Sequence, residues 1–314
     1  MFKGSLKHHI KQALPAYAIM IILIMIASGM SENFRSVRNM SNVMLQATPL
    51  AIVAIGQAIV LIAAGIDMSV GSIISLSTVI MATVSTTVGA AAAAILALIA
   101  GAIVGIVNGI GVTKLHIPPL ITTISTAAIV KGIALFILKS PGGSVDESIL
   151  LLVKKVGPLL IPVASILMLL LYVAAFLFMH QTRTGRAIYA LGGNEVNAKQ
   201  TGFLIDRLTI FSYVLCGLLA AFSGVVIAGR IYSGDPLIGD NYSMDSVAAA
   251  IVGGISMSGG MGSVVGALAG AIILSMINNV LNMLNVFAYY QYIVKGLILL
   301  LALLVFNLRR AKRR

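Results

Sequence analysis

The chain has 314 residues, of which 59% are hydrophobic and only 10% charged, with a mean hydropathy of +1.06. Soluble domains of this length carry about 25% charged residues, so the composition excludes a water-covered globular fold and indicates a lipid bilayer as the surrounding phase. The net charge of +12 does not predict nucleic-acid binding, because the cations lie at the ends of apolar runs and on both termini. One cysteine and four scattered histidines predict no disulfide and no metal site.

The apolar runs predict an all-α polytopic membrane protein of about ten transmembrane helices, because one crossing needs about 20 apolar residues. In chain order the predicted spans are 12–30, 42–64, 68–88, 90–112, 119–138, 159–179, 208–230, 244–258, 262–284 and 289–307. The eighth span is short, as expected of a broken or re-entrant helix. The whole chain, 1–314, is predicted to form a single transmembrane domain.

The distribution of Lys and Arg predicts that both termini lie inside the cell (N-in, C-in). In that orientation the inner side holds thirteen Lys and Arg residues and the outer side six, as the positive-inside rule requires. The external loop 139–158 is predicted to carry a short surface helix. The cytoplasmic loop 180–207 is the larger inner segment.

Small residues recur at every fourth position in two spans. These are Gly101, Gly105 and Gly109 in the fourth span, and Gly262, Gly266 and Gly270 in the ninth. Such strips let helix backbones approach closely in lipid. We expect them to pack within the subunit, with a subunit interface as the alternative.

Two Gly- and Ser-rich segments, 65–71 and 253–262, interrupt the apolar pattern. Non-helical backbone at membrane depth is tolerated where it is buried in protein or faces a water-filled cavity, so these breaks indicate either a transport pathway or a simple interfacial turn. The polar residues predicted to line a translocation pathway are Gln57, Asp67, Ser69, Asn108, Asn278, Asn282 and Asn285. The alternatives are capping of the next helix at Ser69 for Asp67, and bonding between helices for the asparagines.

Sequence signatures of catalysis are missing. The chain contains no G-x-x-x-x-G-K-[ST] phosphate-binding loop, no H-E-x-x-H and no G-x-S-x-G. We therefore expect no enzymatic activity and no cofactor bound by this chain.

The cytoplasmic loop contains a predicted short amphipathic helix. Asn194 is a suitable N-cap and Gly202 a suitable C-terminal stop. A short surface helix between two spans is an element that a soluble motor protein could grip.

Several motifs together resemble the ribose-type monosaccharide permeases of ABC importers. The cytoplasmic motif is Arg-Thr-Gly-Arg-x-x-Tyr-Ala-Leu-Gly-Gly-Asn-Glu at 183–195. The others are Ala-Ile-Gly-Gln at 54–57, Ala-Gly-Ile-Asp-Met-Ser-Val-Gly-Ser at 64–72, and the glycine-rich run at 249–262. The likeness extends from about residue 32 to 306.

The resemblance implies a set of partners and a coupling site. A separate ABC ATPase would bind ATP and Mg²⁺ and dock on the inner face, an external solute-binding protein would deliver the solute, and a second permease copy or paralogue would complete the pathway. Such permeases lie in the cytoplasmic (inner) membrane of prokaryotes. The residues expected to couple to the ATPase are Arg183, Gly185, Arg186, Gly192, Gly193, Asn194, Glu195 and Gly202.

Two other classes of transporter remain open. The first is an ABC permease for branched-chain amino acids, nucleosides or an autoinducer furanose, which would share the architecture. The second is an ion-coupled secondary carrier, in which Asp67 would be the coupling group.

Overall fold

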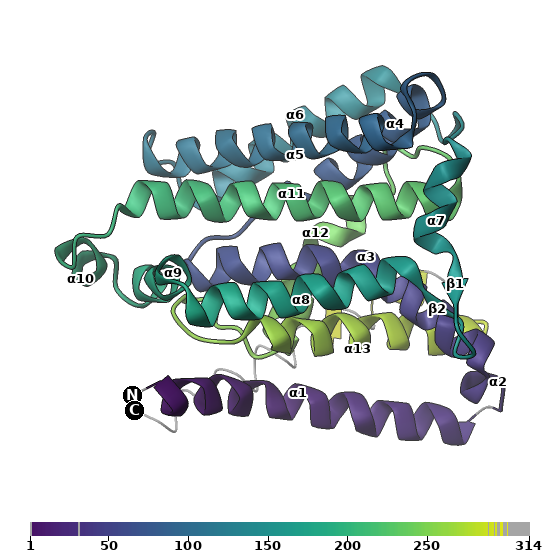
Figure 1. Ribbon diagram of the computed structural model, residues 1–314, viewed down its shortest axis with the longest axis horizontal. Coiled ribbons are helices and arrows are strands. Elements are labelled where there is room, and N and C mark those ends of the chain that lie inside the picture. The colour runs from purple at the N-terminus through teal and green to yellow at the C-terminus, as the bar shows by residue number, and fades with distance from the viewer. Residues whose placement is uncertain are drawn as a thin grey trace.

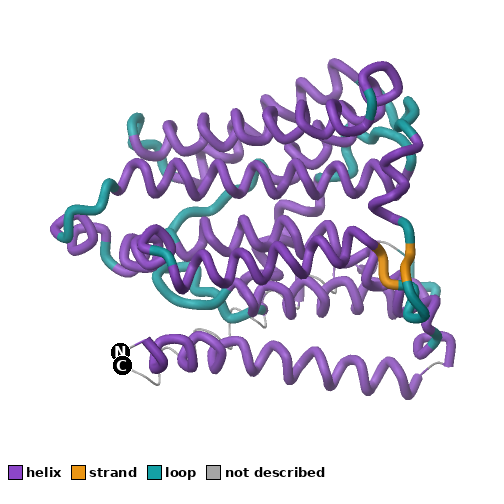
Figure 2. Tube along the Cα trace, in the orientation of Figure 1, coloured by secondary structure: helices purple, strands orange, loops and turns teal. Residues whose placement is uncertain are grey.

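The long helices lie side by side along one axis, and most loops lie at the two ends of the bundle (Figures 1 and 2). The computed structural model describes residues 2–30, 32–287, 289–291, 293, 296–297 and 300. The long helices are α1 (Phe2–Met30), α3 (Val37–Ile62), α4 (Val70–Val88), α5 (Ala90–Thr113), α6 (Pro119–Ile137), α8 (Val163–Gln181), α11 (Ile205–Ile231) and α13 (Val264–Met283).

Shorter elements connect these helices. They are α2 (Glu32–Arg35), the 3₁₀ helix η1 (Glu147–Ile149), α7 (Leu150–Val153), α9 (Arg183–Gly193), α10 (Glu195–Gln200) and α12 (Asp240–Val252). Strands β1 (Lys155–Val156) and β2 (Ile161–Pro162) pair antiparallel, with Lys155 opposite Pro162. In Figure 1, α9 and α10 lie at one end of the bundle, together with the start of α1, and α7, β1 and β2 lie at the other. We call these the α9 end and the α7 end.

Seven helices of the described chain are long and apolar enough to cross a membrane: α3, α4, α5, α6, α8, α11 and α13. They correspond to seven of the predicted spans, so the polytopic all-α class is confirmed. Helix α1 carries a shorter apolar stretch, Ala13–Gly29, inside the first predicted span. The tenth predicted span, 289–307, lies largely outside the described residues.

Two predicted span boundaries are wrong. The sixth helix begins at Val163 rather than 159, because the β1–β2 hairpin occupies the preceding residues. The eighth predicted span, 244–258, is replaced by α12, which ends at Val252. A 13-residue helix is about 20 Å long, which is too short for a hydrocarbon core of about 30 Å.

The segment 232–262 nevertheless runs from one end of the bundle to the other. Near its start, Gly234 exchanges two backbone hydrogen bonds of 2.9 Å with Gly142 of the loop at the α7 end. Near its finish, the Gly260 N–H donates to the Ile62 carbonyl (2.9 Å) beside α9. The passage therefore combines a non-helical stretch, 232–239, with α12, and the predicted break in the eighth span is confirmed.

Helix α3 forms the centre of the bundle. Every residue from Ala47 to Ile62 is buried, and α11, α13, α12 and α8 pack around it. Helices α5, α6 and α8 instead expose rows of large apolar side chains, including Ile129 and Leu170. An apolar surface of this kind is stable against lipid tails and not against water.

Both small-residue strips pack within the chain, as expected, but Gly262 precedes α13, which begins at Val264, and does not share its face. Gly101, Gly105 and Gly109 of α5 lie directly against the backbone of α11 at Gly217, Tyr213 and Ile210. In α13, Gly266 and Gly270 lie against Gly253 and Ala249 at the end of α12. Because the hydrophobic effect gives little drive for helix association in lipid, this close backbone contact stabilises the bundle.

We expect Gly101→Ala to lower the midpoint of thermal unfolding in detergent. A Cβ at this position would collide with the Gly217 carbonyl oxygen and lie 2.7 Å from the Ala221 Cβ, and overpacking of this kind costs about 1–3 kcal/mol. Gly132→Ala in α6 is the matched control, because a Cβ there meets nothing within 4 Å and alanine favours the helix by about 1 kcal/mol. Equal midpoints for the two variants would contradict the close α5–α11 contact.

Candidate functional site

The segment between α3 and α4 turns back into the bundle. Ala64 adopts a left-handed conformation (φ 63°), and the Gly65 N–H donates to the Val60 carbonyl (2.9 Å), which ends α3 and reverses the chain. Asp67 thereby lies beside Gln57. In the amide orientation that satisfies both residues, Gln57 donates to the Asp67 carbonyl (3.0 Å) and accepts from the Asp67 N–H (3.3 Å).

The Asp67 side chain organises a buried polar network. Its Oδ1 accepts from the Ser69 N–H (2.9 Å) and the Ser69 hydroxyl (2.6 Å). Asn108 of α5 donates to the Ser69 Oγ (2.8 Å) and more weakly to Asp67 Oδ1 (3.4 Å). Thr126 of α6 donates to the Asn108 Oδ1 (2.6 Å). We call Gln57, Asp67, Ser69, Asn108 and Thr126 the Asp67 network; it joins α3, α4, α5 and α6.

The depth of this network follows from helix geometry. Gln57 and Asn108 each lie five residues before the end of their helix. At 1.5 Å per residue this is about 7.5 Å inside the α9 end. The non-helical turn is therefore embedded among helices, where its free backbone groups need partners. Hydroxyls supply them: Tyr213 donates to the Ile66 carbonyl (3.3 Å), and Ser243 donates to the Met68 carbonyl (2.8 Å).

The Asp67 network is sealed from the surface. Gln57, Asp67, Ser69 and Asn108 have no exposed surface at all. Asp67 Oδ2 makes no hydrogen bond of ordinary length within the described part of the chain, and the thiol of Cys216 lies close to the Asp67 side chain. A carboxylate enclosed in this way fastens the turn to the N-terminus of α4. These four side chains do not line an open channel in this conformation.

The three predicted asparagines at 278, 282 and 285 lie elsewhere, as the contacts of their neighbour Asn279 show. Asn279 of α13 exchanges hydrogen bonds with Asn39 of α3 (3.3 and 3.4 Å). Asn39 precedes Gln57 by 18 residues of the same helix, which is about 27 Å, so this group lies at the α7 end. The seven predicted pathway residues therefore form two separate sets, one at each end of α3.

One predicted asparagine, Asn285, does not lie on the helix face that the sequence predicted for it. Asn278 is half-buried, and Asn282 is exposed and accepts from the Gln291 side chain (2.8 Å). Asn285 cannot share their helical face, because α13 ends at Met283 and Asn285 turns the chain with φ 55°. The expectation of one face for 278, 282 and 285 is wrong in this respect.

The loop between α8 and α11 contains two helices. The predicted helix is confirmed as α10, because the Asn194 side chain accepts from the Asn197 N–H (3.0 Å), and Gly202 follows the helix with φ 82°. Helix α9 before it was not predicted. Its signal was present in the sequence as Ala187, Ile188 and Leu191, which recur at helical spacing and form its buried face.

Helix α9 packs on two non-helical segments at once. A Cβ on Gly192 would collide with the Ile62 carbonyl oxygen at the end of α3 and lie 2.6 Å from the Gly260 N. The Tyr189 hydroxyl donates to the Gly262 carbonyl (2.9 Å), and burial raises the pKa of this phenol above its ordinary value. We call this contact of α9, the end of α3 and the loop 253–262 the α9 junction.

The eight predicted coupling residues divide by exposure. Gly185 and Gly192 are buried against the chain itself, and the others are exposed: Arg183, Arg186, Gly193, Asn194, Glu195 and Gly202. The loop therefore presents an outer polar surface while its inner face contacts the helices. The inner face thereby connects the loop directly to the end of α3 and to the loop 253–262.

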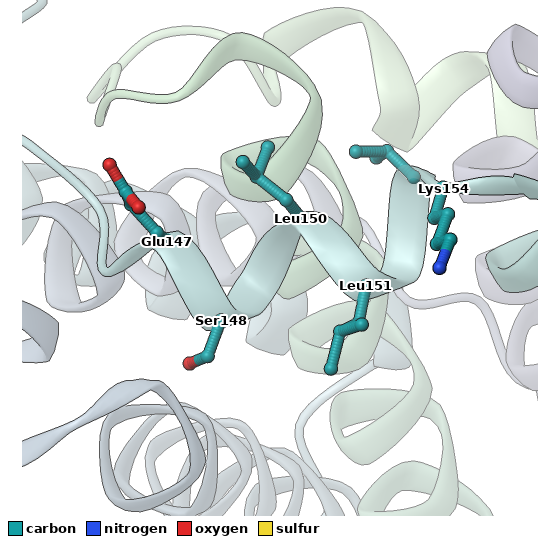
Figure 3. A pocket seen from close by; sticks show the side chains of 6 residues that line it. Glu147, Ser148, Leu150, Leu151 and Lys154 are labelled. Atoms are coloured by element: carbon teal, nitrogen blue, oxygen red, sulfur yellow. The ribbon is translucent and has the colours of Figure 1, made fainter.

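At the α7 end, η1 and α7 form the short helix expected in the loop 139–158. They line a shallow hollow of about 660 Å³ with Glu147, Ser148, Leu150, Leu151, Val153 and Lys154 (Figure 3). The preceding Asp146 caps η1, and hydrogen bonds from Ser148 lower the pKa of its carboxyl. Leu151 is 62% exposed. The surface combines charged and apolar side chains, as at a membrane boundary.

We expect Asp67→Ala to destabilise the protein more than Asp67→Asn. Alanine leaves the buried Ser69 N–H and hydroxyl without their acceptor, at a cost of about 1–3 kcal/mol, while asparagine keeps a side-chain oxygen at the same position. Thermal unfolding of the purified chain in detergent measures the difference. If both variants lost the same stability, the charge of Asp67 rather than its accepted hydrogen bonds would matter.

Most of the chain is similar to known transport permease components. A family described as "Branched-chain amino acid transport system / permease component" matches residues 39–303. The ribose import permease protein RbsC of Escherichia coli K12 is 45% identical over 150 residues, which are 48% of this chain and 47% of that protein. RbsC of Bacillus subtilis is 42% identical over 145 residues (46% and 45%). The xylose transport system permease protein XylH of E. coli K12 is 38% identical over 142 residues (45% and 36%).

The chain thus spans about half the length, or less, of these curated relatives. No solved structure matches it. The family match covers most of the chain, including α9, α10 and the Asp67 network, and its members are transport permease components rather than enzymes. With seven helices able to cross a membrane, the chain is a multi-pass membrane protein, and it belongs to the family of branched-chain amino acid transport system permease components.

Proposed function

We propose that this chain is the permease subunit of an ABC importer that carries a monosaccharide or a related small hydroxylated solute across the cytoplasmic membrane of a prokaryote. The observation that carries the proposal is the likeness to permeases named for ribose, galactose and xylose. The α9 junction supports it, because an exposed helical surface rests there directly on the ends of buried segments.

The proposed assembly has four kinds of component. Besides this chain, a separate ATPase binds ATP and Mg²⁺, an external binding protein delivers the solute, and a second permease copy or paralogue completes the pathway. This chain binds no cofactor itself. Residues 1–314 form one transmembrane domain of about ten spans with both termini inside, in which the external loop is 139–158 and the cytoplasmic loop 180–207.

In this proposal the ATPase pushes on α9 and α10. Because Gly192 allows α9 to touch the Ile62 carbonyl without an intervening side chain, displacement of α9 moves the end of α3 and the turn at 63–69. The Asp67 network then transmits the movement to α4, α5 and α6 as one unit. The exchange between inward- and outward-facing states is driven by the differential affinity of the ATPase for the two states.

One observation bears on each of the two alternative functions: the first is favourable and the second is unfavourable. The description of the matched family favours branched-chain amino acids as the solute, and nucleosides or an autoinducer furanose would use the same architecture. An ion-coupled carrier would need Asp67 to reach the aqueous phase. Its full burial and its bonds to Ser69 speak against that role.

We expect Gly192→Ala to abolish ATP-dependent uptake by the assembled importer, because the added methyl separates α9 from the end of α3. Gly29→Ala in α1 is the matched control, since a Cβ there meets nothing within 4 Å and the position is not among the predicted coupling residues. Uptake of labelled ribose and xylose into cells is measured at equal levels of inserted protein. Normal uptake by Gly192→Ala would refute the coupling role of the α9 junction.

Orientation is tested with two cysteine variants of similar exposure, Val196→Cys in α10 (66%) and Leu151→Cys in α7 (62%). A membrane-impermeant maleimide should label Leu151→Cys in intact spheroplasts, and Val196→Cys only after permeabilisation. The reverse pattern would place α10 outside the cell and exclude its contact with a cytoplasmic ATPase.

A further inference from the structure

An ion pair lies on the surface of the bundle within the membrane span. Lys131 of α6 contacts both carboxylate oxygens of Asp240 at the start of α12 (2.9 and 2.7 Å). The side chains are 37% and 46% exposed. Unlike the Asp67 network, this pair is open to whatever surrounds that face of the chain.

The depth of the pair is fixed by the helices that carry it. Lys131 is twelve residues from the start of α6 and six from its end, or about 18 and 9 Å. Asp240 is held against α4 because the Gly239 N–H donates to Ser75 Oγ (2.9 Å) and the Gly71 N–H to Ser243 Oγ (3.1 Å). Ser75 lies thirteen residues, about 20 Å, before the end of α4. Both charges therefore lie between the ends of helices that are long enough to cross the bilayer.

Polar side chains continue from the pair along α12. One face of α12 carries three polar residues at helical spacing, Asp240, Asn241 and Asp245. Met244 lies on the same face and is 59% exposed. Next to them, Tyr242 interacts with the guanidinium of Arg230. The two cations and two carboxylates balance, so the face has many donors and acceptors but no net formal charge. We call Lys131, Arg230, Asp240, Asn241, Met244 and Asp245 the α12 face.

Neither lipid nor a dry protein contact suits this face. Partly exposed charges at membrane depth are costly against lipid and almost always face the protein interior or a water-filled cavity. Charged residues are also depleted from the buried cores of subunit interfaces. Water satisfies all of these groups, and so do the hydroxyls of a neutral sugar.

We propose that the α12 face lines the water-filled solute pathway, and that its balanced donors and acceptors are suited to a neutral polyhydroxylated solute rather than an ionised one. The inference rests on the proposed transport function and moves the solute contacts away from the sealed residues Gln57, Asp67, Ser69 and Asn108. It makes α12, the broken crossing, the element that contacts the solute.

The test is cysteine labelling in the complete importer. The variants are Met244→Cys and Ile129→Cys. Membrane fragments that are accessible from both sides are treated with a charged methanethiosulfonate reagent, which reaches only water-exposed thiols. Ile129 is the matched control because it is 63% exposed, two residues from Lys131, in an apolar row of α6. The wild-type chain gives the background, since Cys216, its only cysteine, is fully buried.

We expect Met244→Cys to react at least about tenfold faster than Ile129→Cys, because only a thiol in contact with water forms the reactive thiolate. Modification of Met244→Cys should also block the uptake that this variant supports before labelling. Equal rates, or undiminished uptake after complete labelling, would overturn the assignment of the α12 face. An unlabelled wild-type importer that transports no monosaccharide would instead refute the proposed solute class, and the labelling contrast would stand independently.

Discussion

The turn at 63–69 leaves the helical conformation inside the bundle, and the arrangement around it depends on how its backbone groups are satisfied. In lipid an unpaired N–H or C=O has no water to bond with. The Asp67 side chain, Gln57, Tyr213 and Ser243 each supply a partner. Helices α3, α11 and α12 consequently converge on this turn, and α9 rests on the helix end that precedes it.

The two ends of the molecule are built differently. At the α9 end, glycines let backbone touch backbone, as at Gly192 and Gly260, so that movement of one segment must displace its neighbour. At the α7 end, the backbone pair of Gly142 with Gly234 is combined with contacts between polar side chains, such as Asn39 with Asn279. In the proposed importer, the end on which the ATPase would push is the one where α9, the end of α3 and the loop 253–262 meet backbone to backbone.

Much of this fold could be predicted from the sequence, because long apolar runs in a membrane protein have one stable conformation. The eighth crossing could not, since hydropathy does not distinguish a helix from a shorter helix preceded by a buried non-helical stretch. The same limit explains Asn285, where a left-handed turn ended the helix early. The Asp67 network was predicted as a set of polar residues, but its closure depends on Thr126 and on three-dimensional contacts that helix periodicity does not encode.

The stretch 232–239 passes along α4 without a helical ladder, and threonine and serine hydroxyls hold it instead. Thr78 bonds both the N–H and the carbonyl of Asp235 (3.1 and 3.0 Å), and Ser75 bonds the Gly239 N–H. Each such bond is worth about 1 kcal/mol net, and each hydroxyl can rotate to a new acceptor. The connection between α11 and α12 therefore depends on a few individual hydroxyl groups, so the loss of Thr78 or Ser75 would detach it locally while leaving the backbone bonds of the neighbouring helices in place.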